Sequence, residues 1–167
     1  MKKTLLTIFC SLLFAFTTLA QKQSSPAPDK PGMSIFVEAG GPGVISFNYD
    51  TRFTASDKGI GGRIGVGGFK ANNSGSVYVP VGLTYLLSKN NKDYFEIGTG
   101  FTYVNYTMNA DDVIDFSPFK KSFGHLNFGY RYQQKEGGLI FRVAFNPVFG
   151  DGFFNPAYGG IALGYKF

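Results

Sequence analysis

The chain has 167 residues, a length that fits one domain, and its 16 basic and 11 acidic residues give a net charge of +5. A single cysteine excludes an intramolecular disulfide framework and a cysteine-rich zinc site, and a single histidine excludes a two-histidine metal centre. With 23 glycines, 19 phenylalanines, 10 tyrosines, no tryptophan and only 16% charged residues, the composition is unusual for a water-soluble enzyme.

The first twenty residues are typical of a secretory signal peptide. Lys2 and Lys3 form a short positive region, residues 5–19 are mostly apolar, and small residues precede a cleavage position after Ala20. A retained membrane-spanning helix is the alternative, but the apolar run is shorter than the ~20 residues that such a helix needs. Cleavage would remove Cys10 and leave 14 basic and 11 acidic residues, a net charge of +3 without the basic patch typical of nucleic-acid binding.

Residues 21–32 read QKQSSPAPDKPG, and their proline, serine and charge predict a flexible leader before a folded domain at 33–167. From there on, apolar residues alternate with the period of two that is typical of β-strands, and no helical period appears. The predicted strands are residues 34–40, 44–53, 60–69, 76–87, 94–106, 125–133, 138–148 and 157–167. Most approach the ~9–11 residues of a tilted membrane-spanning strand. Turn residues join the predicted strands, and even the longest connector, residues 108–121, is too short to be a crossover helix. The sequence therefore predicts an all-β fold, an eight-stranded antiparallel up-and-down transmembrane β-barrel.

Each predicted strand has one apolar face and one face of glycine, small residues and isolated charges. In residues 44–53, for example, Phe47 and Tyr49 alternate with Asn48 and Asp50. A soluble barrel would turn its apolar face inward, whereas an outer-membrane barrel turns this face to lipid. The interior of a small barrel has too little volume for all these aromatic rings. The apolar face is therefore predicted to face lipid.

The charges on the small face are predicted to form a polar network that closes the lumen. Arginine dominates them, and its planar guanidinium suits buried pairing with carboxylates. Individual pairs stay unassigned because the shear of the barrel is unknown. The predicted members are Glu38, Asp50, Arg52, Arg63, Glu96, His125, Arg131 and Arg142. Such a network would block bulk flow, so a porin is not expected.

The last residues alternate up to a terminal aromatic, through Tyr165 to Phe167. This ending resembles the C-terminal recognition strand of bacterial outer-membrane proteins, which the barrel-assembly machinery reads. Residues 33–167 as a whole resemble the small eight-stranded outer-membrane barrels of the OmpA- and OmpX-like class, although tryptophan is absent and the outer loops are short. Residues 43–53, 79–87 and 124–132 resemble a family of uncharacterised bacterial barrel proteins.

The resemblance implies a location in the bacterial cell outer membrane, contact with outer-membrane lipids and lipopolysaccharide, and no established activity. With eight strands, both chain ends would lie in the periplasm, and the outer loops would fall near residues 40–43, 70–75, 108–121 and 149–155. Aromatic residues are expected at the membrane rim. The candidate contacts with lipid or with an outer-membrane protein partner are Lys120, Lys121, Phe153 and Phe154.

No catalytic residue, metal or cofactor is predicted. Asp111, Asp112 and Asp115 match no calcium-loop spacing. Lipid A deacylase-type barrels use a histidine with a nearby serine, but Asn127 stands where that serine would follow His125. The predicted function is a non-enzymatic barrel with a plugged polar lumen that serves envelope integrity or acts as an accessory subunit of an outer-membrane assembly. A lipid-modifying enzyme and a secreted lipocalin-like binding barrel are the alternatives, and the latter lacks its Gly-x-Trp signature.

Overall fold

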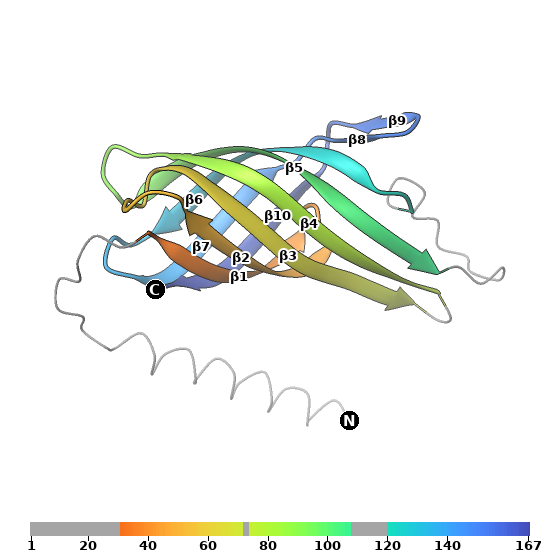
Figure 1. The fold of residues 1–167 in the computed structure, drawn as a ribbon, viewed down its shortest axis with the longest axis horizontal. Helices are drawn as coiled ribbons and strands as arrows, with labels where there is room; N and C mark the ends of the chain where they lie inside the picture. The colour runs from red at the N-terminus through yellow and green to blue at the C-terminus, as the bar shows by residue number, and fades with distance from the viewer. Residues whose placement is uncertain (1–30, 72–73, 108–119) are drawn as a thin grey trace, which may run out of the picture.

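The computed structural model describes residues 31–71, 74–107 and 120–167 (Figure 1). The predicted signal peptide, the leader up to residue 30, and the acidic stretch of the long connector lie outside these ranges. The described residues form ten strands: β1 (Met33–Gly40), β2 (Ile45–Arg52), β3 (Gly59–Ala71), β4 (Ser74–Leu87), β5 (Asp93–Thr107), β6 (Phe123–Gln133), β7 (Gly138–Phe145), β8 (Val148–Gly150), β9 (Phe153–Asn155) and β10 (Gly159–Lys166). No helix in the described ranges is long and apolar enough to cross a membrane.

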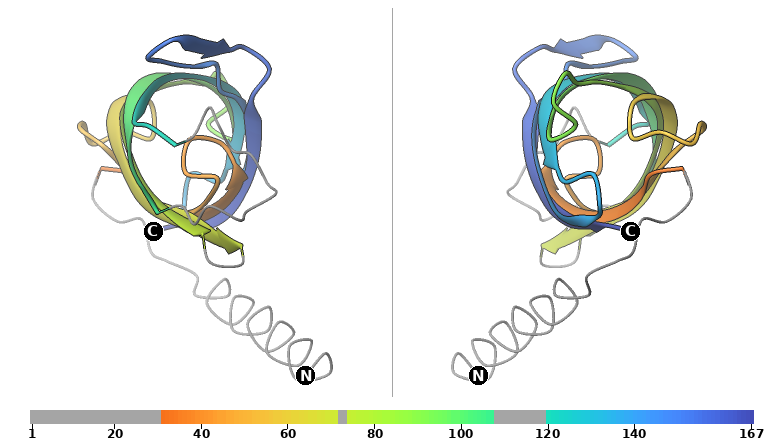
Figure 2. Two further views of the ribbon diagram at one scale, coloured as in Figure 1. Left: turned by 90° about the vertical axis from the view of Figure 1, so that its right-hand side faces the viewer. Right: turned by 90° about the vertical axis from the view of Figure 1, so that its left-hand side faces the viewer.

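Eight of these strands close into an antiparallel barrel. Their order around the wall is β5-β4-β3-β2-β1-β10-β7-β6, and pairing of β6 with β5 completes the ring. The first strand pairs with the last, which sets Ser34 opposite Lys166. Figure 2 shows the ring from both ends. The predicted fold class, an eight-stranded antiparallel barrel, is confirmed.

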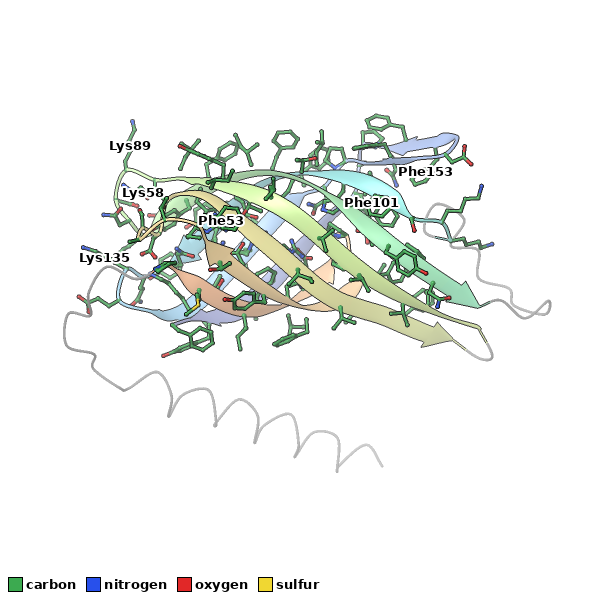
Figure 3. All side chains as sticks on the ribbon, in the orientation of Figure 1. Phe53, Lys58, Lys89, Phe101, Lys135 and Phe153 are labelled. Atoms are coloured by element: carbon green, nitrogen blue, oxygen red, sulfur yellow. The ribbon has the colours of Figure 1, made fainter. Side chains whose placement is uncertain are left out.

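The side chains alternate between the interior and the outer surface as the period of two requires. Along β2, Phe47 and Tyr49 are exposed on the outside, whereas Asn48 and Asp50 are buried inside. The same alternation covers the outer wall with aliphatic and aromatic side chains (Figure 3). The barrel is therefore apolar outside and polar inside.

The two ends of the barrel differ. At the end that we call the terminal end lie Met33, Phe167 and the turns near Lys58, Lys89 and Lys135 (Figures 1 and 3). The opposite end, here the loop end, carries the β1–β2 turn and the connection from β7 to β10. Strands β3, β4 and β5 have 13, 14 and 15 residues, whereas β1, β2, β7 and β10 have 8 each. The wall is therefore taller on the β3–β5 side.

The predicted strand at residues 138–148 is too long, because β7 ends at Phe145. Pro147 has no backbone N–H and cannot continue the ladder. The chain instead forms a short hairpin from β8 and β9 where an outer loop was predicted at residues 149–155. This β8–β9 hairpin joins the barrel by pairing of β8 with β6, through Gly124↔Phe149 and His125↔Val148.

The connection between β1 and β2 was predicted as an outer loop, but it folds into the mouth of the barrel. Gly41, Pro42 and Gly43 are all buried, and Figure 2 shows this turn, in orange, within the ring. Gly41 has φ +67° and donates its N–H to the carbonyl of Gly159 at 3.1 Å. A Cβ at Gly41 would lie 2.6 Å from the carboxyl carbon of Glu38, so only glycine fits here. The turn thus covers the interior at the loop end.

Candidate functional site: the charged lumen

The structure places all eight residues of the predicted polar network inside the barrel. None of them is more than 7% exposed. They come from six strands: Glu38 from β1, Asp50 and Arg52 from β2, Arg63 from β3, Glu96 from β5, His125 and Arg131 from β6, and Arg142 from β7. Their inward direction follows from the alternation of each strand. The pairs that they form depend on the stagger between strands.

Glu96 is held by two arginines from neighbouring strands. Arg142 donates from Nε to Glu96 Oε2 at 3.1 Å and from Nη2 to Oε1, which makes a bidentate pair. Arg131 Nη1 lies 3.7 Å from Oε2. Asn127 Nδ2 donates a further hydrogen bond to Oε1 at 2.8 Å. The buried carboxylate therefore has a charged or polar partner at both oxygens.

Asp50 forms a second centre that Arg131 joins to the first. Arg52 Nη2 lies 2.8 Å from both carboxylate oxygens of Asp50. Arg131 Nη1 donates to Asp50 Oδ1 at 3.2 Å, and its Nη2 donates to Ser34 Oγ at 2.7 Å. Arg131 thus lies between the carboxylates of Glu96 and Asp50 and connects β5, β2 and β1 through the lumen.

Glu38 forms the third centre, under the inward turn. Arg63 Nη2 forms an ion pair with Glu38 Oε2, and Arg142 Nη1 lies 3.5 Å from Oε1. Arg63 also donates from Nε to Asn48 Oδ1 at 3.1 Å. Because Arg142 contacts both Glu38 and Glu96, the three centres form one connected network.

Phe36 is the apolar element of this network. Its ring lies on the interior face of β1, with the guanidinium carbons of Arg142 and Arg63 at 4.4 and 5.0 Å from the ring centroid. Cation–π attraction of this kind is strongest where the cation is desolvated. Four arginines and three carboxylates give the network one excess positive charge, and the aromatic face provides the arginines with a further partner.

His125 lies inside the barrel with the network but has a different environment. Its Nδ1 lies 3.4 Å from Thr102 Oγ1. A Cβ at Gly100 would lie 2.5 Å from His125 Nε2, so the ring packs directly on the backbone of β5. Within the ranges that the structure describes, no group of three or more His, Cys, Asp or Glu residues could hold a metal ion. The geometry is that of a hydrogen-bonded interior histidine.

The terminal end of the lumen is closed by an ion pair that the sequence did not indicate. Lys166 Nζ lies 2.5 Å from Asp57 Oδ2, which belongs to the β2–β3 turn. The same ammonium donates to the carbonyl oxygens of Lys135 and Gln134 at 2.6 and 3.3 Å. The strand period placed Lys166 on the interior face, but the turn residue that pairs with it carried no signal of its own.

The loop end is closed by an apolar cluster above the charges. Its buried members are Tyr78, Val104, Phe123 and Val148. Tyr158, in the connector before β10, packs against them half-buried. Burial raises the pKa of the Tyr158 phenol above its ordinary value, and the negative charge of Glu38 adds to this effect. Apolar contacts therefore close the lumen at this end.

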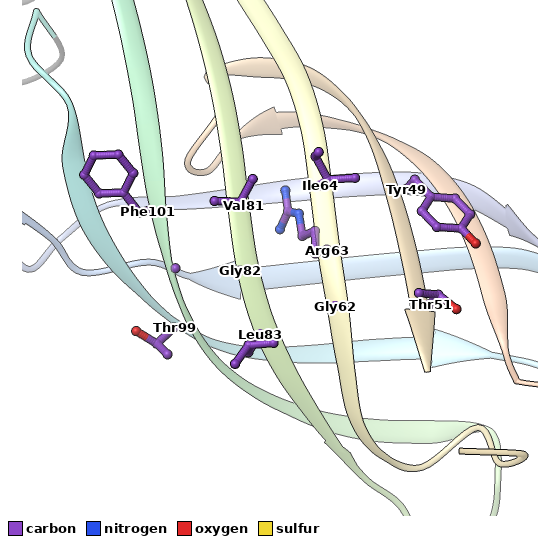
Figure 4. Close-up of a pocket in the computed structure, with 11 residues that line it drawn as sticks. Tyr49, Thr51, Gly62, Arg63, Ile64, Val81, Gly82, Leu83, Thr99 and Phe101 are labelled. Carbon is purple, nitrogen blue, oxygen red and sulfur yellow. The ribbon is translucent and has the colours of Figure 1, made fainter. Parts of the chain in front are cut away.

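A shallow groove on the outer wall has no part in this network. It has a volume of about 600 Å³ and lies where Gly62, Thr51 and Thr99 leave a depression between larger side chains (Figure 4). Arg63 lines it, but the guanidinium of Arg63 pairs with Glu38 in the interior. The groove is therefore an apolar feature of the outer wall.

The other predicted contact residues lie at the two rims. Tyr165 and Phe167 are at the terminal end, with ring centroids 5.7 Å apart. Lys121 Nζ lies 3.0 Å from Asp151 Oδ2 at the loop end, where both side chains are exposed. Lys120 is half-buried next to it.

The structure places Phe153 and Phe154 on opposite faces of the hairpin. Phe154 is exposed, but Phe153 points the other way, and its ring centroid lies 6.5 Å from that of Phe123 in the apolar cluster. Adjacent residues of a strand point to opposite faces, so the two cannot share one contact surface. Phe149 lies opposite Phe154 in the hairpin, on the same exposed face.

Comparison with known proteins shows the fold. No protein-family model matches the chain, and no curated protein sequence matches it. The N-terminal β-barrel domain of Pseudomonas aeruginosa OprF is 11% identical with a TM-score of 0.57, covering 82% of this chain and 96% of that one. The chain has the fold of the small eight-stranded outer-membrane barrels.

Two further solved structures have a similar arrangement of strands. The Yersinia pestis outer membrane protein Ail is 14% identical with a TM-score of 0.52, covering 83% of this chain and 100% of that one. The outer membrane enzyme PagL is 15% identical with a TM-score of 0.43, covering 81% and 97%, a likeness too low to bear on activity. Without a matching family model, the resemblance to a narrower barrel family stays a prediction.

Proposed function

We propose that this protein is an integral barrel of the bacterial outer membrane, with a closed lumen and a structural or accessory role in the envelope. The observation that carries the proposal is the inverted distribution of side chains. Phe47, Leu83 and Leu163 are exposed on the outer wall, whereas Glu96 and Arg142 are buried inside. A continuous apolar outer wall is unfavourable in water and favourable in the hydrocarbon core of a membrane.

The same observation disfavours the secreted lipocalin-like alternative. A ligand-binding barrel in water needs a polar outer wall and an interior with space for an apolar ligand. Here the wall is apolar and charged side chains fill the middle of the interior. The likeness of the fold to the OprF barrel domain and to Ail supports the outer-membrane location.

The proposal predicts that the folded barrel does not conduct like a porin. The ion pairs around Glu96, Asp50 and Glu38 occupy the lumen, the β1–β2 turn covers them, and Lys166 closes the terminal end. Planar-bilayer recordings of the refolded protein should show no large, steady conductance, with a wide-channel porin as the positive control. A steady ohmic conductance of porin size would overturn the closed lumen.

The interior position of His125 supports a non-enzymatic role. An enzyme that acts on membrane lipid needs an activated nucleophile beside a base where the lipid can reach them. His125 is buried in the lumen and contacts Thr102. The backbone of the barrel therefore separates the side chain of His125 from lipid at the outer wall.

Mass spectra of lipid A test the enzymatic alternative directly. We expect the same acyl pattern in a deletion strain and in strains complemented with the wild type or with His125→Ala. Heat-modifiable gel migration would confirm that the variant folds. An altered pattern that the wild type restores and His125→Ala does not would establish a lipid-modifying activity.

The expected partners follow from the proposed location. Tyr165 and Phe167 are proposed to act as the recognition signal for the barrel-assembly machinery. Outer-membrane lipid and lipopolysaccharide are proposed to cover the apolar wall, with Lys120 and Lys121 near lipid phosphates at the loop end. An accessory role would add an outer-membrane protein partner.

A further inference from the structure

The β8–β9 hairpin leaves the ring of strands at Asn146 and Pro147. The N–H of Asn146 donates to the carbonyl of Tyr158 at 2.7 Å, and the N–H of Leu126 donates to the carbonyl of Pro147 at 2.9 Å, so the base of the hairpin is fixed. From there the hairpin runs outside the ring of strands (Figures 1 and 2). Its position is therefore set by the barrel wall.

The two faces of the hairpin continue the two faces of the wall. Phe149 and Phe154 are directly opposite each other in the β8–β9 register and are 42% and 66% exposed. The ring of Phe149 lies over the outer face of β6, where a Cβ at Gly124 would be 2.4 Å from it. On the other face, Val148 is fully buried and Phe153 packs into the apolar cluster. The outward face is thus the aromatic one.

The hairpin extends the wall where the wall is short. Strands β7 and β10 have 8 residues each, fewer than the ~9–11 that a tilted strand needs to cross a membrane. Below the hairpin, exposed Phe128, Val143 and Phe145 line an outer groove together with its base at residues 157–159. The apolar surface is therefore continuous from the middle of the wall to Phe149 and Phe154.

The tip of the hairpin is charged. Asp151 in the β8–β9 turn pairs with Lys121, and both side chains are largely exposed. Aromatic rings beside charged groups at the upper edge of an apolar band are the arrangement found at the boundary between lipid and water. The chemistry of the hairpin thus changes from apolar to charged over a few residues.

We propose that the β8–β9 hairpin is an interfacial anchor, with Phe149 and Phe154 in the boundary region of the lipid bilayer at the loop end. It completes the apolar band on the side where β7 and β10 are short. The occupant of this surface is lipid, because the surface continues the lipid-facing wall. The inference rests on the proposed membrane location.

The absence of tryptophan from the chain allows a direct test. Single-tryptophan variants at Phe154, at Phe149 and at Leu163 in the outer wall, with Lys89→Trp in an exposed terminal turn, would be refolded into phosphatidylcholine vesicles that carry bromine at defined acyl depths. Heat-modifiable gel migration identifies the variants that fold. One folded variant at either hairpin position, Phe149 or Phe154, is sufficient for the test. We expect Phe154→Trp and Phe149→Trp to be quenched most by shallow bromines and Leu163→Trp by deep ones. Lys89→Trp should be quenched least and should emit at the longest wavelength.

Three other outcomes would overturn the inference in different ways. If the hairpin variants behave like Lys89→Trp while Leu163→Trp is quenched, the hairpin lies in water and the membrane location stands. If Leu163→Trp is also unquenched, the proposed location itself fails. If the hairpin variants emit at short wavelength but lipid bromines do not quench them, protein covers the hairpin, either a second copy of the chain or another partner.

Discussion

Replacing Glu96 with glutamine is expected to destabilise the folded barrel by about 3–5 kcal/mol, the usual cost of removing one partner from a buried ion pair. The carboxylate of Glu96 faces Arg142 at bidentate distance and Arg131 at 3.7 Å, and both arginines are buried. Without it, four guanidinium groups would share the two carboxylates of Asp50 and Glu38. Because glutamine keeps the shape of the side chain, the loss of stability measures the effect of removing the negative charge.

Urea titration of the protein refolded into vesicles, followed by tyrosine fluorescence, measures this loss. The matched control is Asp151→Asn, which removes an acidic partner from the exposed Lys121–Asp151 pair. Exposed pairs contribute about 0–1 kcal/mol. Equal, small losses in Glu96→Gln and Asp151→Asn would contradict a desolvated lumen network. Glu38→Gln provides a second buried variant if Glu96→Gln does not refold.

Replacing Leu83 with arginine is expected to cost about 2–4 kcal/mol, as a charge does on the lipid face near the middle of a bilayer. Leu83 is 49% exposed on the outer wall of β4. On the surface of a soluble protein, an exposed substitution of this kind changes stability by only about 0.5 kcal/mol. The size of the stability loss therefore distinguishes an outer wall in lipid from an outer wall in water.

The same titration in vesicles measures the cost, with Leu83→Met as the apolar control of similar volume. A loss close to that of the control would mean that water surrounds the wall at Leu83. Such a result would contradict the proposed membrane location and would leave the barrel fold unaffected.

The strands and their facing could be predicted from the sequence because both depend on local alternation. The period of two in β2 places Asn48 and Asp50 inside and Phe47 outside without knowledge of any other strand. The partners inside the lumen could not be predicted in this way. Arg131 contacts Asp50 and Ser34 on strands far away in the sequence, and these contacts depend on the stagger of the whole barrel.

The two connections that the sequence described incompletely differ in cause. Pro147 is a visible break, but the pairing of the residues after it with β6 depends on where β6 begins. The turn at Gly41 reads as an exposed glycine-rich loop, and its inward fold depends on free space in the barrel mouth above Glu38. Neither the start of β6 nor the free space in the barrel mouth can be read from a single strand.

Pairing of β1 with β10 has a consequence for how the chain reaches its folded state. The wall cannot close until its last strand is available, because Ser34 pairs with Lys166. Contacts between residues so distant in the sequence are made slowly, and before closure the sheet exposes two unpaired edges that favour aggregation. The contacts of Arg131 with Ser34 and of Arg142 with Glu38 span this closure and form late. We therefore expect that weakening the charged network in the lumen would raise the unfolding rate far more than it would lower the folding rate.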